Sequence, residues 1–260
     1  MVNIKKKKII NKIKLTKITQ LDMKVVILAG GFGSRIADHS VLPKPMIPVG
    51  KYPIIEHIMR IYIQQGFRKF IIPVGYKGEI IEKFFKKKKK IFSGCEIQIV
   101  NTGLNSHTGT RLEKIKHLIN EDNFMLTYGD GLSNIDLKKL IRFHIKHNKT
   151  VTVTAVHPPA RFGELEINLN NVVKSFEEKP QLQSGWINGG FFVFKKNFFD
   201  LIPKKNVMIE REPLALASKK KQFMAFKHEN FWYCIDNRRD HKIIEKIYRK
   251  GNAPWLNLNK

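Results

Sequence analysis

One stretch of the chain decides its fold: residues 25–35, VVILAGGFGSR, with Pro43-Lys44-Pro45 a few positions further on. Its first four residues are apolar, which predicts a buried strand. Three glycines within four positions follow, and glycine lets successive backbone N–H groups come close to an anion or a base. Arg35 and Lys44 add positive charges, and the prolines beside Lys44 restrict its backbone. The combination predicts a binding site for a nucleoside triphosphate.

Two better-known glycine motifs do not fit this stretch. A P-loop closes with Gly-Lys-Ser or Gly-Lys-Thr, whereas Gly33 is followed by Ser34-Arg35. A dinucleotide-binding fingerprint needs a third glycine where Ile36 stands, and an acidic residue after the next strand, where the chain reads Pro73-Val74-Gly75-Tyr76. An ordinary glycine-rich turn would require neither the arginine nor the flanked lysine. The triphosphate site is therefore the better interpretation.

Apolar runs of strand character alternate with segments of helical periodicity. This alternation predicts a βαβ architecture with a mainly parallel sheet. Beyond residue 157 the runs become shorter and richer in strand formers, which we expect to form a lobe continuous with the same sheet. The expected strands are 24–28, 70–74, 97–100, 124–128 and 151–156, and the expected helices are 54–65, a segment ending near 85, 111–119 and 137–145.

These motifs resemble those of the sugar-phosphate nucleotidyltransferases. The family pattern L-A-G-G-x-G-[TS]-R followed by P-K-P matches from Leu28 to Pro45, and the resemblance covers about residues 23–248. Two strings, Pro-Pro-x-Arg-Phe-Gly at 158–163 and Trp-Ile-Asn-Gly-Gly-Phe-Phe at 186–192, point to the cytidylyl branch. The other matching strings are Gly-Tyr-Lys-Gly at 75–78, Asn-Thr-Gly at 101–103, Thr-Gly-Thr-Arg-Leu at 108–112, Thr-Tyr-Gly-Asp-Gly at 127–131, Glu-Lys-Pro at 178–180, Arg-Glu-Pro-Leu at 211–214 and Phe231-Trp232 with Asp236 following.

The resemblance implies a Rossmann-like α/β nucleotidyltransferase fold, with helices flanking the sheet and a β-rich sugar-binding lobe. It implies a Mg²⁺-dependent enzyme that transfers a cytidylyl group from CTP to glucose 1-phosphate. The products would be pyrophosphate and CDP-glucose, a precursor for the deoxysugars of surface polysaccharide such as O-antigen. Two alternatives stay open: a nucleotidyltransferase of the same fold that uses another nucleotide or sugar 1-phosphate, and a catalytically silent ligand-binding relative.

The site residues carried over from the family fall into four groups. Catalytic roles go to Arg35, Lys44, Asp130 and Lys179, and the metal ligands are Asp130 and Asp236. Nucleotide binding is expected from Leu28, Ala29, Gly30, Gly31, Gly33, Ser34, Arg35, Lys44, Thr110, Arg111 and Gly129. Sugar-phosphate binding is expected from Gly163, Glu178, Lys179, Asn188, Gly189 and Trp232.

Each of these assignments competes with a plainer structural reading. Asp130 and Asp236 each follow an apolar run, where acids can hold a cation at a strand end, but Asp130 also suits a turn and Asp236 a helix N-cap. The Glu178-Lys179 pair also suits a solvated surface. Asn188-Gly189-Gly190 also suits a β-bulge, and Trp232 also suits the core.

Two departures from the family pattern are visible. The chain passes from Phe85 through a lysine run to Ile97, where relatives carry a longer segment. Ile235-Asp236-Asn237 stands where the family usually has Met-Asp-Thr. The first departure bears on subunit contacts or a lid, and the second on the surroundings of the metal ligand.

Composition narrows the remaining possibilities. The net charge of +26 is spread along the chain without a nucleic-acid-binding signature, so we expect a basic surface and no specific nucleic-acid partner. Two distant cysteines and the lack of an apolar run near 20 residues favour a cytoplasmic protein with no membrane contact. We expect residues 1–22 to form a disordered basic extension, and residues 23–260 a single domain with a nucleotide-binding half (about 23–156) and a sugar-binding half (about 157–260). A homo-oligomer stays open.

Overall fold

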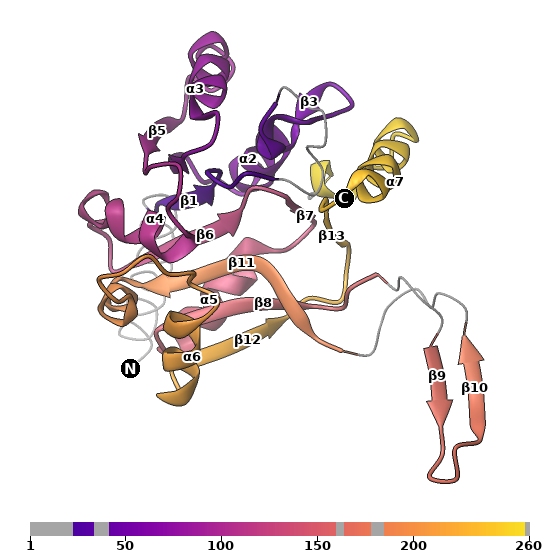
Figure 1. Ribbon diagram of the computed structural model, residues 1–260. Helices are drawn as coiled ribbons and strands as arrows, with labels where there is room; N and C mark the ends of the chain where they lie inside the picture. The colour runs from indigo at the N-terminus through magenta and orange to yellow at the C-terminus, as the bar shows by residue number, and fades with distance from the viewer. Residues whose placement is uncertain (1–22, 34–41, 160–163, 178–184, 258–260) are drawn as a thin grey trace, which may run out of the picture.

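The computed structural model describes residues 23–33, 42–159, 164–177 and 185–257. Within these residues the central sheet has seven strands in the order β12-β8-β11-β6-β1-β4-β5 (Figure 1). All run parallel except β11, which is antiparallel to both of its neighbours, so the predicted mainly parallel sheet is confirmed. The strands are β1 (Val25–Leu28), β4 (Lys69–Val74), β5 (Glu96–Asn101), β6 (Asn123–Tyr128), β8 (Val151–Val156), β11 (Ile187–Lys195) and β12 (Phe223–Lys227).

Helices cover both faces of this sheet because successive strand side chains point to opposite sides. Val25 and Ile27 of β1 join one buried cluster, and Val26 and Leu28 join the other. The first cluster takes its helical residues from α2 (Ile54–Gln64), α3 (Gly78–Lys87), α5 (Leu137–His147), α7 (Arg238–Arg249) and the 3₁₀ turn η4 (Pro254–Leu256). The second takes them from α4 (Thr108–Lys114), the 3₁₀ helix η3 (Lys196–Leu201) and α6 (Glu212–Lys219), with the 3₁₀ turn η2 (Lys116–Leu118) following α4.

Local signals set where the helices begin and end. Helix α2 starts after Pro53 and is followed by Gly66 at a φ of +99°, a left-handed conformation that glycine adopts freely. Helix α7 begins at a capping box in which Asn237 accepts the Asp240 backbone N–H and the Asp240 side chain accepts the Asn237 backbone N–H. The N-cap of α7 is therefore Asn237, which leaves the neighbouring Asp236 side chain for other contacts.

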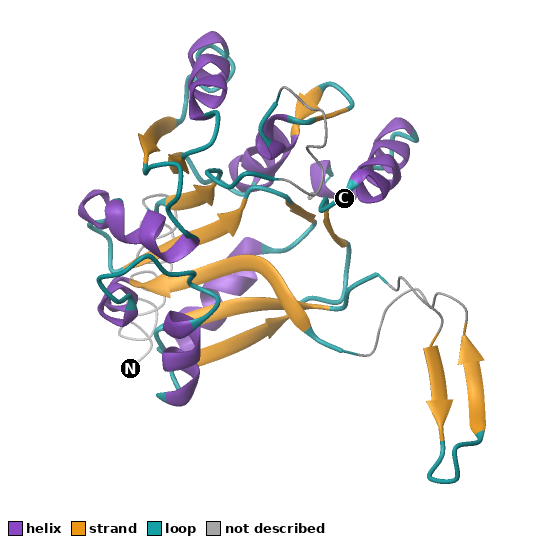
Figure 2. Cartoon of the chain, viewed as in Figure 1, coloured by secondary structure: helices purple, strands orange, loops and turns teal. Residues whose placement is uncertain are grey.

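Three two-stranded sheets lie outside the central one. They are β2 (Pro48–Val49) with β3 (Tyr52–Pro53), β7 (Gly131–Ser133) with β13 (Trp232–Cys234), and β9 (Glu164–Ile167) with β10 (Val173–Glu177). The β-rich second half was predicted to continue the main sheet, and β11 and β12 do so. The β9–β10 hairpin instead stands away from the body (Figures 1 and 2).

The strand order creates a switch point beside β1. The chain pairs β1 with β4 on one side and with β6 on the other. Leu28 at the end of β1 pairs with Tyr128 at the end of β6, so the segments that follow leave the sheet side by side. Ligands of open α/β sheets bind at the carboxyl ends of strands that flank such a point.

No helix among the described residues has both the length and the apolar character to cross a membrane.

Candidate active site

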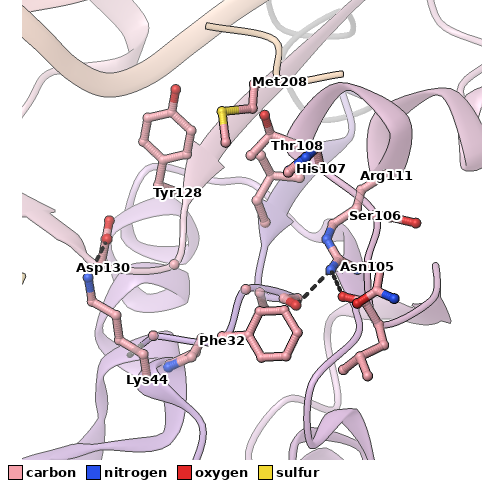
Figure 3. A pocket seen from close by; sticks show the side chains of 18 of the residues that line it. Phe32, Lys44, Asn105, Ser106, His107, Thr108, Arg111, Tyr128, Asp130 and Met208 are labelled. Atoms are coloured by element: carbon pink, nitrogen blue, oxygen red, sulfur yellow. Dashed lines mark hydrogen bonds and ion pairs between the residues drawn. The ribbon is translucent and has the colours of Figure 1, made fainter. Parts of the chain in front are cut away.

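A cavity of about 810 Å³ opens at the carboxyl ends of β1 and β6 (Figure 3). Its volume suits a ligand of several hundred daltons, since small-molecule sites commonly measure ~300–1,000 Å³. Residues from six separate parts of the chain line it, namely Leu28–Gly33, Lys44–Pro45, Leu104–Thr108 with Arg111, Tyr128–Asp130, Asn206 with Met208 and Glu210, and Asp236.

The glycine turn after β1 is shaped by two close contacts. Gly33 has a φ of +63°, and a side chain there would overlap the stem of Lys44 at 2.7 Å. A Cβ on Gly30 would overlap the Arg111 guanidinium. Gly31 has open space beside it, facing the cavity. The turn therefore brings bare backbone to the cavity wall while both of its ends are packed against cationic side chains.

Lys44 joins two carboxylates at one side of the cavity. Its Nζ donates to Asp130 Oδ2 at 2.8 Å and to Asp236 Oδ1 at 3.0 Å (Figure 3 shows the first bond). The three residues come from the 3₁₀ turn η1 (Lys44–Met46), the end of β6 and the segment between β13 and α7. Burial alone would lower the pKa of Lys44, but the charge of Asp130 and the hydrogen bonds to Asp130 and Asp236 act against it, and its pKa lies above the ordinary value.

The structure bears on the alternative roles of the two aspartates, a turn for Asp130 and a helix N-cap for Asp236. Asp236 is not the N-cap of α7, since Asn237 holds that position. Asp130 does occupy a turn, between β6 and β7, and its backbone carbonyl accepts the Ile235 N–H at 2.9 Å. That bond fixes the two acidic segments side by side, so the turn itself serves to bring the carboxylates together.

The donor set at this cluster fits a divalent cation. Ligand atoms of Asp130, Asp236 and Cys234 lie within 4.8 Å of one another. Two oxygens on opposite sides of one Mg²⁺ would be about 4 Å apart, given Mg–O distances near 2.1 Å. Burial raises the pKa of the Cys234 thiol. The two carboxylates are the groups that suit Mg²⁺, which prefers oxygen ligands.

Arg111 lines the cavity, but its terminal nitrogens form hydrogen bonds within the protein. They donate to five acceptors, the backbone carbonyls of Val74, Gly103, Gly30 and Leu104 and the hydroxyl of Thr102, at 2.7–3.2 Å. The side chain is only 3% exposed. Arg111 was expected to bind the nucleotide, and in the structure its guanidinium joins three loops that form the cavity wall. Thr110 is absent from the lining among the described residues, and its hydroxyl contacts Lys205, Asn206 and Val207 instead.

Of the residues expected to bind sugar phosphate, Asn188 lies beside Tyr128. Asn188 Nδ2 donates to the Tyr128 hydroxyl at 3.2 Å, and its Oδ1 accepts the Gly190 N–H. The β11–β8 pairing shifts register just after Asn188, so the bulge expected as the plainer reading is present. Trp232 Nε1 donates to the Gly189 carbonyl at 2.7 Å while its ring packs against the core. Trp232 lines a neighbouring cavity of about 510 Å³ and is not part of the larger cavity's lining.

Several lining residues carried no signal in the sequence. Phe32, Tyr128, Met208 and Glu210 each reach the cavity, and Glu210 accepts a hydrogen bond from Thr108 Oγ1 at 2.7 Å. Burial and the nearby Glu210 charge raise the pKa of the Tyr128 phenol, which keeps it protonated. Tyr128 could have been suspected from its position directly before the glycine-flanked Asp130. Met208 and Glu210 follow η3, about 80 residues further on, and no local pattern marks them.

Five predicted site residues lie outside the described part of the chain. They are Ser34, Arg35, Gly163, Glu178 and Lys179.

The site just described, an acidic pair and a lysine beside a glycine turn at the carboxyl edge of a parallel sheet, can neutralise and align phosphates. The sequence matches the model of the nucleotidyl transferase family over residues 24–240, and the chain belongs to that family.

Individual relatives of the chain give a more specific comparison. The glucose-1-phosphate cytidylyltransferase of Salmonella typhimurium is 39% identical over 254 residues, 90% of this chain and 98% of that protein. The probable glucose-1-phosphate cytidylyltransferase of Bacillus subtilis is 36% identical over 253 residues, 90% and 99% of the two chains. The crystal structure of HddC from Yersinia pseudotuberculosis superposes with a TM-score of 0.68 at 25% identity, covering 87% of this chain and 99% of that one, and it is also solved in complex with GMP-PN. The predicted family and fold are confirmed.

Proposed function

We propose that this protein transfers a cytidylyl group from CTP to glucose 1-phosphate, which gives CDP-glucose and pyrophosphate. The observation that carries the proposal is the 39% identity to a glucose-1-phosphate cytidylyltransferase along 98% of that protein. The cavity supports it, since a glycine turn, a lysine and two carboxylates meet at a switch point of the sheet.

In the proposed reaction, a phosphate oxygen of glucose 1-phosphate attacks the α-phosphorus of CTP. The new P–O bond forms while the bond to the leaving pyrophosphate breaks. A sugar phosphate is already ionised near neutral pH, because its second pKa is about 6, so no side chain has to remove a proton. The protein then contributes alignment and charge neutralisation.

Specific residues carry those two tasks in the proposal. Backbone N–H groups of Gly30–Gly33 contact the triphosphate, and Lys44 neutralises the charge that grows on the α-phosphate. Asp130 and Asp236 would hold Mg²⁺, which supplies further charge neutralisation on the phosphates. Arg35 and Lys179 are proposed as additional phosphate contacts on the family pattern. Asn188 and Gly189 are proposed to bind the sugar.

Base and sugar selectivity can be tested in one assay. Purified protein with Mg²⁺ is incubated with each of the four nucleoside triphosphates and with several hexose 1-phosphates, and pyrophosphate release is followed. We expect rapid release only with CTP and glucose 1-phosphate. The Lys44→Met variant, prepared in the same way, controls for contaminating enzymes.

Other outcomes would identify the alternatives. Release with GTP instead of CTP would favour a guanylyltransferase, an alternative supported by the GMP-PN complex of the HddC structure. Release with no pair would contradict enzymatic function and favour a ligand-binding relative.

The proposal also has a cellular setting. We infer a cytoplasmic reaction, where nucleoside triphosphates and sugar phosphates are available, and a product that enters deoxysugar synthesis for surface polysaccharide. Both described cysteines, Cys95 and Cys234, are free thiols, which agrees with a reducing compartment.

A further inference from the structure

The β9–β10 hairpin has one apolar face that nothing in the described chain covers. Leu165 and Phe176 pair directly across the two strands, so their side chains share a face. Val173 belongs to the same face, because the register shift between Val173 and Ser175 leaves both Lys174 and Ser175 beside Glu166 on the opposite face. The exposed fractions of Leu165, Val173 and Phe176 are 53%, 49% and 62%.

The opposite face of the hairpin is polar. Glu166 pairs with Ser175, whose Oγ donates to Glu166 Oε2 at 3.5 Å, and Lys174 Nζ lies 3.5 Å from Glu166 Oε1. The hairpin is thus amphipathic although it projects into solvent (Figure 1). A two-stranded hairpin alone in water is at best marginally stable, and a buried apolar face would stabilise it. The hairpin sequence therefore suits packing against another surface.

The charge of the hairpin indicates the kind of surface that would bind it. Residues 164–177 carry three glutamates against one lysine, so the hairpin is acidic in a chain whose net charge is +26. A basic and partly apolar partner surface would complement it, since complementary charges steer association and fix its register. Another copy of this strongly basic chain provides such a surface.

One groove on the molecule has the required chemistry. A cavity of about 440 Å³ between α3 and β5 is lined by apolar side chains and flanked by lysines, its residues being Glu82, Phe85, Lys86, Lys89, Phe92, Cys95, Ile97 and Ile99. Five consecutive lysines, Lys86–Lys90, span the end of α3. Strand β5 is the terminal strand of the central sheet, so its outer edge can also accept a neighbouring strand. We call this surface the α3–β5 groove.

The hairpin and the α3–β5 groove lie at opposite ends of the molecule (Figure 1). We infer that the apolar face of the β9–β10 hairpin of one copy docks into the α3–β5 groove of a second copy. Because the two contacting surfaces differ, the interface is heterologous and repeats from copy to copy, as a closed ring or an open chain.

The test disrupts each of the two contacting surfaces in a separate variant. Leu165→Ser with Phe176→Ser removes the apolar face of the hairpin, and Lys86→Glu with Lys89→Glu reverses the charge of the groove. Sedimentation velocity of the full chain over a range of concentrations gives the oligomeric state. We expect the parent protein to sediment as more than one 30.3 kDa chain and each double variant as single chains, with dissociation constants raised at least ~10-fold, the effect of truncating an interface hot spot.

Mixing the two double variants provides the decisive observation. The hairpin variant keeps an intact groove and the groove variant keeps an intact hairpin, so the mixture should form a two-chain complex that cannot grow further. Matched controls are Lys138→Glu with Lys146→Glu, which changes the same charge on exposed positions of α5, and Ile145→Ser, which removes an apolar side chain that is 46% exposed. Both controls should associate as the parent does, and thermal melting confirms that every variant folds.

Three results would overturn the inference. The parent chain would sediment as a monomer at all concentrations, either double variant would keep the parent's oligomeric state, or the mixture would show no species that the separate variants lack. The last result would indicate hairpin-to-hairpin pairing, in which the contact surfaces are the same.

Discussion

Lys44 and Arg111 are two cations on the wall of one cavity, but they stand in different surroundings. Lys44 is bonded to two carboxylates and keeps 13% of its side chain exposed. Arg111 is bonded mainly to backbone carbonyls and is nearly sealed at 3% exposure. A charge paired with other side chains at a cavity can exchange partners with a ligand. A charge that satisfies buried carbonyls cannot leave them without cost. The two ends of the cavity should therefore respond differently to mutation.

The largest effect is expected from the partners of Lys44. Asp130→Asn and Asp236→Asn keep the shape of the side chain but remove the charge that would hold Mg²⁺. Each should lower turnover at least ~10³-fold at low Mg²⁺, the upper range for loss of one preorganised electrostatic contact, with partial recovery at high Mg²⁺ or with Mn²⁺. Asp136→Asn is the matched control, because Asp136 caps α5 and asparagine caps equally well. A fully active Asp236→Asn enzyme would remove Asp236 from the site.

The next largest effect is expected from Lys44→Met. Turnover should fall by ~10²-fold or more because the variant lacks the positive charge proposed to stabilise the transition state. The same change leaves Asp130 and Asp236 without their shared cation, so the free protein should bind Mn²⁺ more tightly than the parent does. Electron paramagnetic resonance of Mn²⁺ measures this directly, with the exposed Lys146→Met as control. Unchanged Mn²⁺ affinity would show that Lys44 does not occupy the cation position.

Arg111→Met should lower the stability of the protein more than its turnover. It leaves several buried carbonyls without a donor, and we expect a loss of about 2–3 kcal/mol in the free energy of unfolding, measured by urea titration. KM for CTP should rise as the loops around Gly30 and Gly103 loosen. Lys114→Met, which removes hydrogen bonds to the Thr102 carbonyl and to Ser106 Oγ, is the milder control on the same helix. Full stability with lost turnover would instead restore the sequence-based prediction that Arg111 contacts the nucleotide.

The smallest effect concerns charges remote from the cavity. A chain that begins at Met23 loses seven lysines and one aspartate, and it keeps a net charge of +20. We expect its turnover with CTP and glucose 1-phosphate to match that of the full chain, since the sequence places residues 1–22 outside the catalytic domain. Comparison of kcat and of salt-dependent nucleic-acid binding for the two chains checks this. Loss of catalysis, or of binding that persists at physiological salt, would give the segment a function.

The sequence predicted the central sheet from its alternating apolar and helical segments, and it placed Asp130 after a strand of that sheet, where ligands of parallel sheets bind. Lys44 and Asp236 were expected at the site from the family motifs. They reach Asp130 from η1 and from the segment after β13, which lie outside the central sheet. Arg111 was expected to bind the nucleotide, and the sequence could not show its burial, which depends on Gly30 and Gly75, two glycines of other loops that have no side chains to exclude it. Met208 and Glu210 were missed because they reach the cavity from an irregular segment with no periodicity. The sequence predicted only that the second half would be rich in strands, and it could not show that the apolar face of the β9–β10 hairpin stays uncovered.

The most direct test of the proposed active site is a crystal structure of the protein soaked with CTP and Mn²⁺, with the anomalous signal of manganese recorded. We expect a manganese peak within bonding distance of Asp130 and Asp236 and the triphosphate against the backbone of Gly30–Gly33. Arg111 should keep its bonds to the loop carbonyls. A nucleotide bound elsewhere, or manganese away from both aspartates while the nucleotide is present, would contradict the proposed site.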